Sequence, residues 1–382
     1  MIVEVFSSNK KSFFFALKEL KDKIDNRFDS YDFLIFSIHP KYGYQDLPYL
    51  IEKIFQTNNY AGFHAVNAFE NENIVEGVVV AVIKFEKEGK INLFHVEDID
   101  KEDVLEKTSN YLNVFKDKLH AIIGGFCKEK FGLFIEKLSE NLNYWPVKNV
   151  IGGISSGNEE NNEMLTYQFV DNIVIKNGFF ILTFDNVEYN IEVALGFKPY
   201  GITYEIKKAD GYKLYTVDDG KNFSYIAQNF LRNFENPDIR YLWYCPINIL
   251  DEEDGYVATL RTFKEVSKDY VEFFGQIKEG QHFKLSFATP EELLEEDLKI
   301  AKQIKSIINY PDFAIDFSCI ARQYVLEDKQ NQEPEVYTSV LNCPLFGFFT
   351  FGEIGPDKYY KKLKLYNETS LLLAVKERWE KK

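Results

Sequence analysis

The stretch that decides the fold of this chain is the aromatic run LFGFFTFGEIGP, residues 345–356. Aromatic residues in an uninterrupted apolar run favour a buried strand, and the closing Gly-Pro marks its end. Glu353 follows Gly352 directly, in a place where an unpaired carboxylate costs free energy. Gly347 and Gly352 lack a Cβ atom, so another backbone or a ligand can come close to them. We therefore expect a polar site at the end of an otherwise apolar strand.

Two segments with polar ends flank this strand in the sequence. Upstream, residues 317–322 read as a strand that ends in a thiol and the guanidinium of Arg322. Downstream, residues 365–372 place polar side chains just before another apolar run. Converging strand ends can hold a small polar ligand between short side chains and backbone amides. The alternative is that Glu353 and Arg322 form a structural ion pair with each other, because buried carboxylates are rarely unpaired.

A family resemblance rests on these motifs. The C-x-x-R sequence at 319–322, the aromatic strand and the Y-N-E-T sequence at 366–369 resemble the C-terminal half of FIST domains. Residues 196–201 resemble the start of that half, and residues 150–153 resemble a motif late in the N-terminal half. FIST domains are intracellular sensory modules of bacterial signal transduction. The resemblance, which spans roughly residues 30–375, implies binding of small ligands such as amino acids.

The candidate ligand-binding residues are Cys319, Arg322, Gly352, Glu353, Asn367 and Thr369. We expect Arg322 to pair with a ligand carboxylate, because a planar guanidinium can donate two parallel hydrogen bonds to it. Glu353 would pair with an amine, and Asn367 and Thr369 would supply neutral hydrogen bonds. Cys319 would be a wall of the site. Such a set suits an amino acid zwitterion, and it needs no reaction of the protein's own.

Two other kinds of function stay open. In an enzyme, Cys319 could act as a nucleophile on a small metabolite, with a pKa lowered by the neighbouring Arg322. Against this, the motifs of the C-terminal half contain no histidine that could serve as general base. In an interaction scaffold, the polar motifs would merely hold the fold. We expect a binding protein and no enzyme.

The charge and the cysteine and histidine content of the chain disfavour some classes of binding partner. The 382 residues include 45 basic and 60 acidic side chains, and a net charge of −15 disfavours nucleic acid or an anionic membrane as partner. The four cysteines and five histidines show no spacing typical of metal ligands, so we expect no metal and no cofactor. No signal peptide and no membrane-spanning apolar run is present. We expect a cytoplasmic protein that passes its signal to a separate signalling protein.

The length and the order of apolar runs predict a mixed α/β (α+β) fold in two domains. We expect an N-terminal domain over residues 1–187 and a C-terminal domain over 188–382, each a mixed, largely antiparallel sheet covered by helices. No Gly-, Ser- or Pro-rich linker separates them, so the halves should pack against each other.

A weak internal repetition runs through the chain. Three apolar runs are each followed by a strand that contains a glycine. The distance from a residue of the run to that glycine is 25 to 29 residues, counted from Ser37 to Gly62, from Gly125 to Gly152, and from Ser318 to Gly347. The closing strands at 76–82 and 368–375 also resemble each other. The third copy differs, because residues 327–335 form a polar, Pro-interrupted stretch that predicts a loop in place of a helix.

Overall fold

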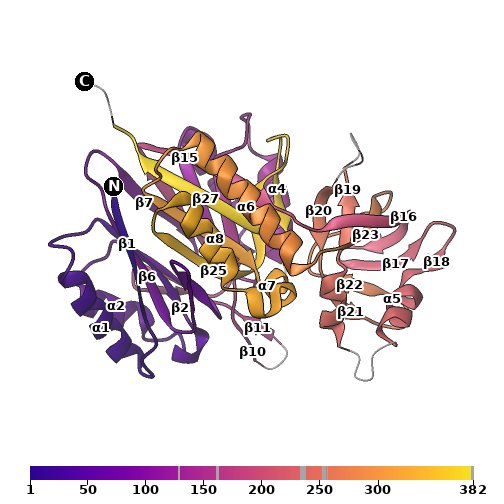
Figure 1. Cartoon of the computed structure of the whole chain (residues 1–382), viewed down its shortest axis with the longest axis horizontal. Helices are drawn as coiled ribbons and strands as arrows, with labels where there is room; N and C mark the ends of the chain where they lie inside the picture. The colour runs from indigo at the N-terminus through magenta and orange to yellow at the C-terminus, as the bar shows by residue number, and fades with distance from the viewer. Residues whose placement is uncertain (128–129, 161–162, 233–237, 252–254, 256, 380–382) are drawn as a thin grey trace.

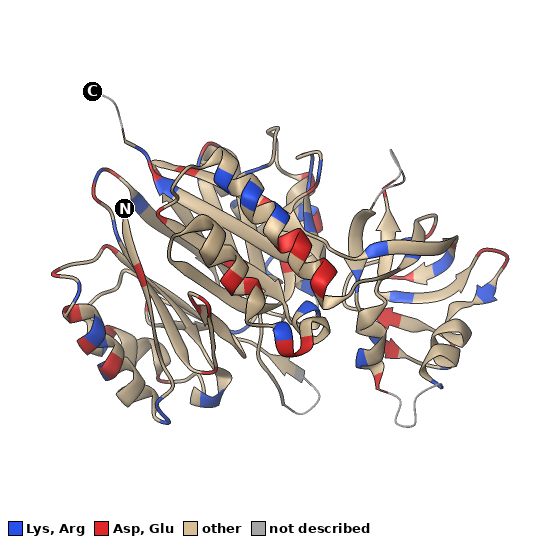
Figure 2. Cartoon of the chain, in the orientation of Figure 1, with Lys and Arg blue, Asp and Glu red and all other residues tan. Residues whose placement is uncertain are grey.

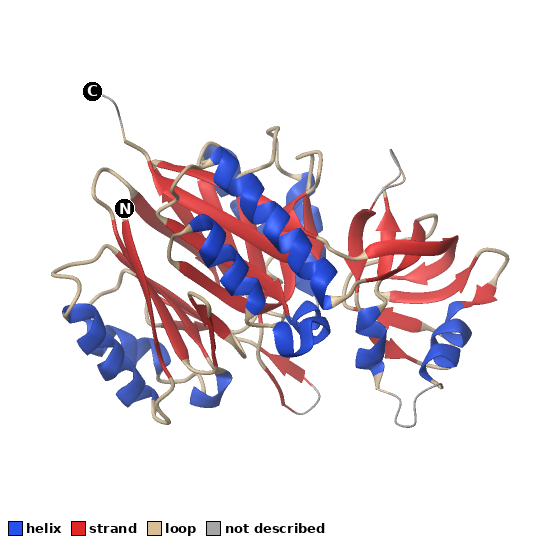
Figure 3. Cartoon of the chain, viewed as in Figure 1, coloured by secondary structure: helices blue, strands red, loops and turns tan. Residues whose placement is uncertain are grey.

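The computed structural model describes residues 1–127, 130–160, 163–232, 238–251, 255 and 257–379. These residues form the mixed α+β fold that the sequence predicts, with three main sheets and helices on their outer faces (Figure 3). Within this part of the chain, no helix is both long and apolar enough to cross a membrane.

Neighbouring strands in each sheet are hydrogen-bonded in the following spatial order. The first sheet contains β1 (Ile2–Ser8), β6 (Val78–Lys84), β2 (Phe33–Ile38), β3 (Tyr60–His64), β12 (Gln168–Val170) and β13 (Ile173–Ile175). The second contains β15 (Val187–Ala194), β27 (Ser370–Glu377), β24 (Phe313–Cys319), β25 (Leu345–Pro356), β9 (Val150–Ser155), β8 (Leu119–Gly124), β14 (Phe179–Asp185) and β7 (Lys90–Val96), with β26 (Leu363–Tyr366), β4 (Ala68–Glu70) and β5 (Asn73–Val75) beside β25. The third contains β20 (Val257–Arg261), β19 (Ile247–Leu250), β23 (His282–Phe287), β16 (Lys198–Asp210), β17 (Lys213–Val217), β22 (Val271–Phe273) and β21 (Phe263–Val266), with β18 (Lys221–Asn222) beside β17. A small hairpin pairs β10 (Asn158–Glu160) with β11 (Glu163–Leu165).

The α-helices are α1 (Phe13–Asp25), α2 (Leu47–Phe55), α3 (Val104–Val114), α4 (Lys130–Glu140), α5 (Phe223–Leu231), α6 (Pro290–Ile307), α7 (Ile320–Leu326) and α8 (Gln332–Leu341) in the described residues. Short 3-10 helices are η1 (Pro40–Tyr42), η3 (Ile239–Tyr244) and η4 (Glu327–Lys329).

The first and second sheets pack face to face. Their shared core is rich in aromatic rings, and the rings of Phe63 in β3 and Phe348 in β25 have centroids 4.3 Å apart. Helices α1 and α2 cover the outer face of the first sheet, and α3, α4, α6 and α8 cover that of the second. Four layers result, with the third sheet forming a separate body beside them (Figure 1). Alternate residues of the long strands in the first two sheets therefore face either the sheet opposite or a helix.

Three copies of one motif build the first two sheets. Each copy runs strand, helix, strand, helix, strand and closing strand, and in each the closing strand lies between the first and second strands. Copy 1 (residues 2–84) has the order β1-β6-β2-β3, and copy 2 (90–185) has β7-β14-β8-β9. Copy 3 (187–194 and 290–377) has β15-β27-β24-β25. The predicted repetition is confirmed.

The three repeat glycines occupy one structural position. Each lies in the third strand of its copy and pairs with the second strand, the pairs being Phe36 with Gly62, Ile122 with Gly152, and Asp316 with Gly347. A Cβ atom on Gly347 would lie 2.3 Å from the ring of Phe69 and 2.9 Å from the backbone oxygen of Asp316. The groups that come close to Gly347 are therefore the protein's own Phe69 and Asp316.

The loop predicted for copy 3 is wrong, because residues 320–341 form α7, η4 and α8. Pro334 is the third residue of α8, where a missing N–H breaks no helical bond, and Glu333 and Glu335 favour the positive end of the helix dipole. The helical pattern is hidden because polar Arg322 and Glu333 are buried where apolar residues would be expected.

Helix α6 follows its sequence signals. The side chain of Thr289 accepts from the backbone N–H of Glu292, and the Glu292 carboxylate accepts from the N–H of Thr289, which makes a capping box. Acidic residues gather near the start of α6 and lysines near its end, as the red and blue segments of Figure 2 show. The buried face of this helix carries Asp297 among apolar residues.

An inserted module interrupts copy 3. Residues 198–287, which contain the third sheet and α5, lie between β15 and α6. The domain boundary after residue 187 stays a prediction. It falls beside the turn at Asn186 that joins β14 to β15, two strands of the same second sheet.

We predict that the repeat glycines differ in their tolerance of alanine. A Cβ atom on Gly152 would lie 1.9 Å from the backbone oxygen of Ile122, whereas the nearest atoms to a Cβ on Gly62 lie at 3.4 Å. Gly152→Ala should therefore lower the free energy of unfolding by about 1 to 3 kcal/mol. Gly62→Ala, the matched control, should change it by less than about 1 kcal/mol. Urea denaturation measures both, and equal effects would contradict the predicted crowding at Gly152.

Candidate functional site

The candidate site lies where three strands of copy 3 meet. Strands β24 and β25 are parallel, so their carboxyl ends lie at the same edge, with Cys319 paired to Thr350. Strand β27 is antiparallel to β24 and starts there, with Ser370 paired to Ser318. The polar residues that follow β24 and precede β27 are therefore brought together, as the sequence predicts.

A bulge in β25 places Glu353 in the site. The register with β9 shifts between Thr350 and Glu353, and Gly352 within the shift has a φ of +150° that favours glycine. Glu353 is fully buried. Its carboxylate accepts hydrogen bonds from the hydroxyl of Thr350 and, at 2.7 Å, from that of Thr369. Burial nevertheless raises the pKa of Glu353 to about 8, because the charged form loses its water.

The turn before β27 adds a second buried acid, Glu368, whose φ is +58°. Its Oε1 atom accepts from the hydroxyl of Thr262 in the inserted module at 2.9 Å. Its Oε2 atom and the Oδ1 atom of the adjacent Asn367 are buried and have no hydrogen-bond partner among the described residues. Burial raises the pKa of Glu368 well above its usual range. Two buried oxygens thus have no hydrogen-bond partner in the described part of the chain.

Cys319 is buried at the same place, and its thiol is not activated. Burial raises the pKa of Cys319 well above its usual range, and the nearby carboxyl groups of Glu353 and Glu368 raise it further. The enzyme alternative needs Arg322 to lower this pKa, whereas burial first and the two acids second raise it.

Arg322 lies in a neighbouring buried cluster with acids from two other helices. Its Nη2 atom forms an ion pair with Asp297 of α6, and its Nε atom donates to Glu333 of α8 at 2.8 Å. The alternative of an ion pair with Glu353 is therefore wrong. The remaining nitrogen, Nη1, has no partner in the described part of the chain, and a Cβ on Gly196 would lie 3.4 Å from it.

Further hydrogen bonds extend this cluster to the second sheet. The hydroxyl of Tyr337 donates to Asp297 at 2.8 Å and contacts the hydroxyl of Ser370 at 2.7 Å. Ser370 in turn donates to Asp316 at 2.8 Å. Burial raises the pKa of Asp297 to about 7 and that of Asp316 well above its usual range. One oxygen of each has no partner among the described residues.

Ser318 connects the two clusters. Its backbone oxygen accepts from Thr350, at 3.2 Å, beside Glu353. Its hydroxyl accepts from Gln323 at 2.7 Å, and Gln323 also donates to Glu333 at 2.7 Å. The clusters therefore form one buried polar region on both sides of the end of β24.

This region is rich in negative charge. Its buried carboxyl groups outnumber its one ion-paired guanidinium, that of Arg322, the acids being Asp297, Asp316, Glu333, Glu353 and Glu368. Unpaired buried carboxylates are costly, so protons or a cationic group must compensate them. Among the described residues, no group of His, Cys, Asp and Glu side chains has the arrangement of a metal site.

Comparison with known proteins assigns the chain to a family. A family model described as the FIST N domain matches residues 32–220, and one described as the FIST C domain matches residues 228–356. The chain belongs to the FIST family. FIST domains are small-ligand sensory domains of signal transduction, so this polar region lies in a sensory fold. A protein of Aquifex aeolicus (strain VF5), described as uncharacterized, is 38% identical over 261 residues, which cover 66% of this FIST chain and 96% of that relative.

The FIST chain brings most of the predicted site residues together. Thr369 bonds to Glu353, Cys319 lies near the same carboxyl group, and a Cβ on Gly352 would lie 3.6 Å from the amide nitrogen of Asn367. Arg322 lies in the adjoining cluster. The ligand-binding role of all six residues stays a prediction.

Several residues of the region were not predicted from the sequence. Glu368 lies inside the Y-N-E-T motif and matches Glu76 in the repeat, which was a usable signal. Asp297 interrupts an apolar helical face that includes Leu293 and Ile300, and an acid on such a face is a second signal. Thr262 had none, because only the fold of the inserted module brings it to Glu368.

The raised pKa of Glu353 predicts a pH-dependent stability. The folded state binds the Glu353 proton up to about pH 8, whereas the unfolded chain releases it near the ordinary value of 4.5. This contribution is fully present below about pH 4.5 and is lost as pH rises through 8, at up to about 1.4 kcal/mol per pH unit. Glu353→Gln should remove the share of Glu353 from the slope measured by urea denaturation between pH 5 and 9, and the other buried acids keep theirs. Glu335→Gln, at an exposed position of α8, is the control, and an unchanged slope in Glu353→Gln would refute the prediction.

Proposed function

We propose that this FIST protein is a cytoplasmic sensor whose buried polar region binds the ammonium group of a small ligand, an amino acid being the class that its charges favour. The observation that carries the proposal is the pair of unpartnered acceptors, Glu368 Oε2 and Asn367 Oδ1, beside the buried carboxyl group of Glu353. Ammonium is a compact donor of three hydrogen bonds, which suits such a set.

The ligand carboxylate has one candidate partner in this region. The Nη1 atom of Arg322 donates no hydrogen bond to any described residue, whereas Nε and Nη2 are held by Glu333 and Asp297. A ligand carboxylate would therefore meet one nitrogen of Arg322, in place of the two-bond geometry expected from the sequence.

In this proposal the inserted module covers the site. Thr262 donates to Glu368, and Arg261 donates to the backbone oxygen of Leu365 at 3.1 Å. Entry of a ligand would require these contacts to loosen, so binding and the position of the module are coupled in this proposal. We propose that a separate signalling protein reads this change, because both matched domains are sensory.

Cysteine catalysis has no support in the geometry. The thiol of Cys319 is buried beside Glu353 and Glu368, and its raised pKa keeps it protonated. A nucleophilic cysteine needs the opposite surroundings, in which a cation or a base favours the thiolate.

The test of ligand binding uses the twenty amino acids in thermal-shift assays and calorimetry. A ligand that binds only the folded state stabilises it by about 2.7 kcal/mol at 100 times its dissociation constant. Glu353→Gln and Glu368→Gln should each weaken binding about tenfold or more, because each removes a carboxyl group that could give up its proton and pair with the ammonium group. Glu335→Gln, on the exposed side of α8, should not. Binding that survives both buried substitutions would place the ligand elsewhere.

Arg322→Lys separates a structural role from a ligand contact. Lysine keeps the charge but cannot reach both Asp297 and Glu333, so unfolding should become easier by about 2 to 4 kcal/mol. If Nη1 meets the ligand, amino acids should bind more weakly while the matching amines that lack a carboxylate are unaffected. A lower melting temperature with every affinity unchanged would make Arg322 purely structural.

Cys319→Ser distinguishes sensor from enzyme. As a wall residue, Cys319 should be replaceable with less than about a tenfold change in affinity, or 1.4 kcal/mol. Mass spectrometry after incubation with metabolites should find no adduct on the native thiol. A covalent adduct on Cys319, or a turnover that Cys319→Ser abolishes, would overturn the proposal.

A further inference from the structure

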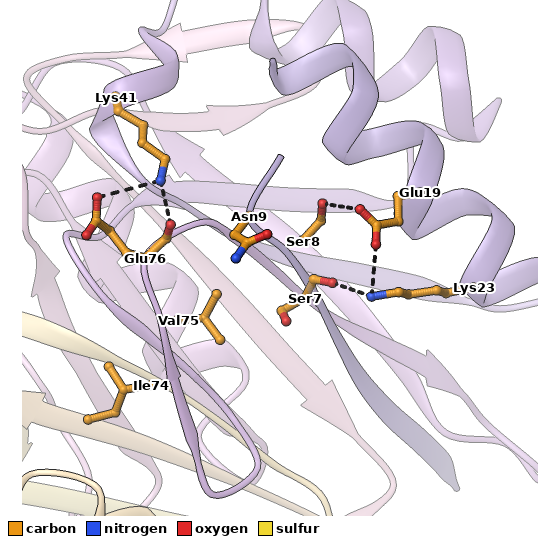
Figure 4. Close-up of a pocket in the computed structure, with 9 residues that line it drawn as sticks. All are labelled: Ser7, Ser8, Asn9, Glu19, Lys23, Lys41, Ile74, Val75 and Glu76. Atoms are coloured by element: carbon orange, nitrogen blue, oxygen red, sulfur yellow. Dashed lines mark hydrogen bonds and ion pairs between the residues drawn. The ribbon is translucent and has the colours of Figure 1, made fainter. Parts of the chain in front are cut away.

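A surface pocket of copy 1 lies at the place that corresponds to the buried site of copy 3. Its volume is about 480 Å³, which is within the usual range for small-molecule sites. It is formed where β1 ends, β6 begins and α1 passes over them (Figure 4), and its lining residues are Ser7, Ser8, Asn9, Glu19, Lys23, Lys41, Ile74, Val75 and Glu76.

The strand registers establish the correspondence. In copy 1, Val78 at the start of the closing strand pairs with Ser8 of the first strand and Ile38 of the second. In copy 3, Ser370 pairs in the same way with the ends of β15 and β24. Glu76 lies two residues before Val78, as Glu368 lies two residues before Ser370. Glu76 and Glu368 are therefore equivalent.

The equivalent places in the other copies are filled by the protein. In copy 3 the module presents the hydroxyl of Thr262 to Glu368. In copy 2 the equivalent residue is Asn177, whose amide donates to Asp98 at 2.5 Å and to Asp100 at 3.2 Å. In copy 1 the same place is the open pocket. In copy 3, this place is therefore occupied by a hydroxyl group that donates a hydrogen bond to Glu368.

The walls of the pocket carry balanced charges (Figure 4). On one side, Lys41 donates to the backbone oxygen of Glu76 at 2.6 Å and lies 3.6 Å from its carboxylate. On the other, Lys23 donates to the backbone oxygen of Ser7 at 2.7 Å and lies 3.5 Å from the carboxylate of Glu19. An ammonium group has three N–H donors, so each lysine can make a further bond.

We propose that this pocket is a second ligand site, for a small carboxylate that also carries a hydroxyl or ammonium donor. The ligand carboxylate would bind Lys23, and its donor would bind Glu76 as Thr262 binds Glu368. Ile74 and Val75 supply the apolar side of the pocket. The inference rests on the repeat and on the pocket, and it does not depend on the proposed function of the buried site.

The test uses L-lactate and propionate, which differ by one hydroxyl, as probes of the full-length protein in ligand-observed NMR titrations. L-lactate should bind at least about fivefold more tightly than propionate, because only it offers a donor to Glu76. Lys23→Met and Glu76→Gln should each weaken L-lactate binding by about fivefold or more. Lys53→Met, at an exposed position of α2, is the control for surface charge and should leave it unchanged.

Other outcomes decide against the proposal. Equal binding of the two probes, or no detectable binding of L-lactate at about 10 mM, overturns it. L-lactate binding that Glu353→Gln abolishes and Lys23→Met preserves also overturns it, because the probe then occupies the buried site. Circular dichroism of each variant confirms that the fold is intact, so a loss of binding reports on the pocket.

Discussion

The pairing of β25 with β9 is the interaction on which the second sheet depends. Strand β25 is parallel to β24 on one side and antiparallel to β9 on the other, so it joins copy 3 to copy 2 in one sheet. At this junction Thr350 pairs with Ser155, its counterpart in copy 2. The face of β25 that bears Phe348 also holds the first sheet. One strand thus unites all three copies, and the bulge at Gly352 in that strand directs an acid inward.

The fold accepts a large electrostatic cost near this strand. The buried polar region holds five carboxyl groups and one ion-paired guanidinium, and replacing such groups by apolar residues often stabilises a protein. Local violations of the rules for a stable core are expected at functional sites. The equivalent strand ends of copy 1 and copy 2 hold no comparable set of buried acids among the described residues. The buried acids are therefore a clear difference between copies that share one backbone.

The sequence predicted the strands around the candidate site and the repeat, because apolar runs report burial directly. Helices α7 and α8 were not predicted because Arg322 and Glu333 form an ion pair inside the core. In a pattern of apolar and polar residues, charged residues that are buried are read as exposed. The candidate site was located through motifs at strand ends, which share an edge by topology. Its partners Asp297 and Thr262 could not be found that way, because contacts between distant elements depend on helix orientation and on the docking of the module.

The place where the module is inserted has a consequence for how such chains can change. The connection that contains it in copy 3 runs from residue 195 to 289, whereas the corresponding connection in copy 1 needs only residues 9–12. Both connections join the same two elements, so the core tolerates a whole folded body at this point without altering its strand order. The first-strand-to-helix loop is accordingly a natural grafting position. A reporter protein spliced into copy 1 there would stand at the rim of its pocket, as the native module stands over the acids of copy 3.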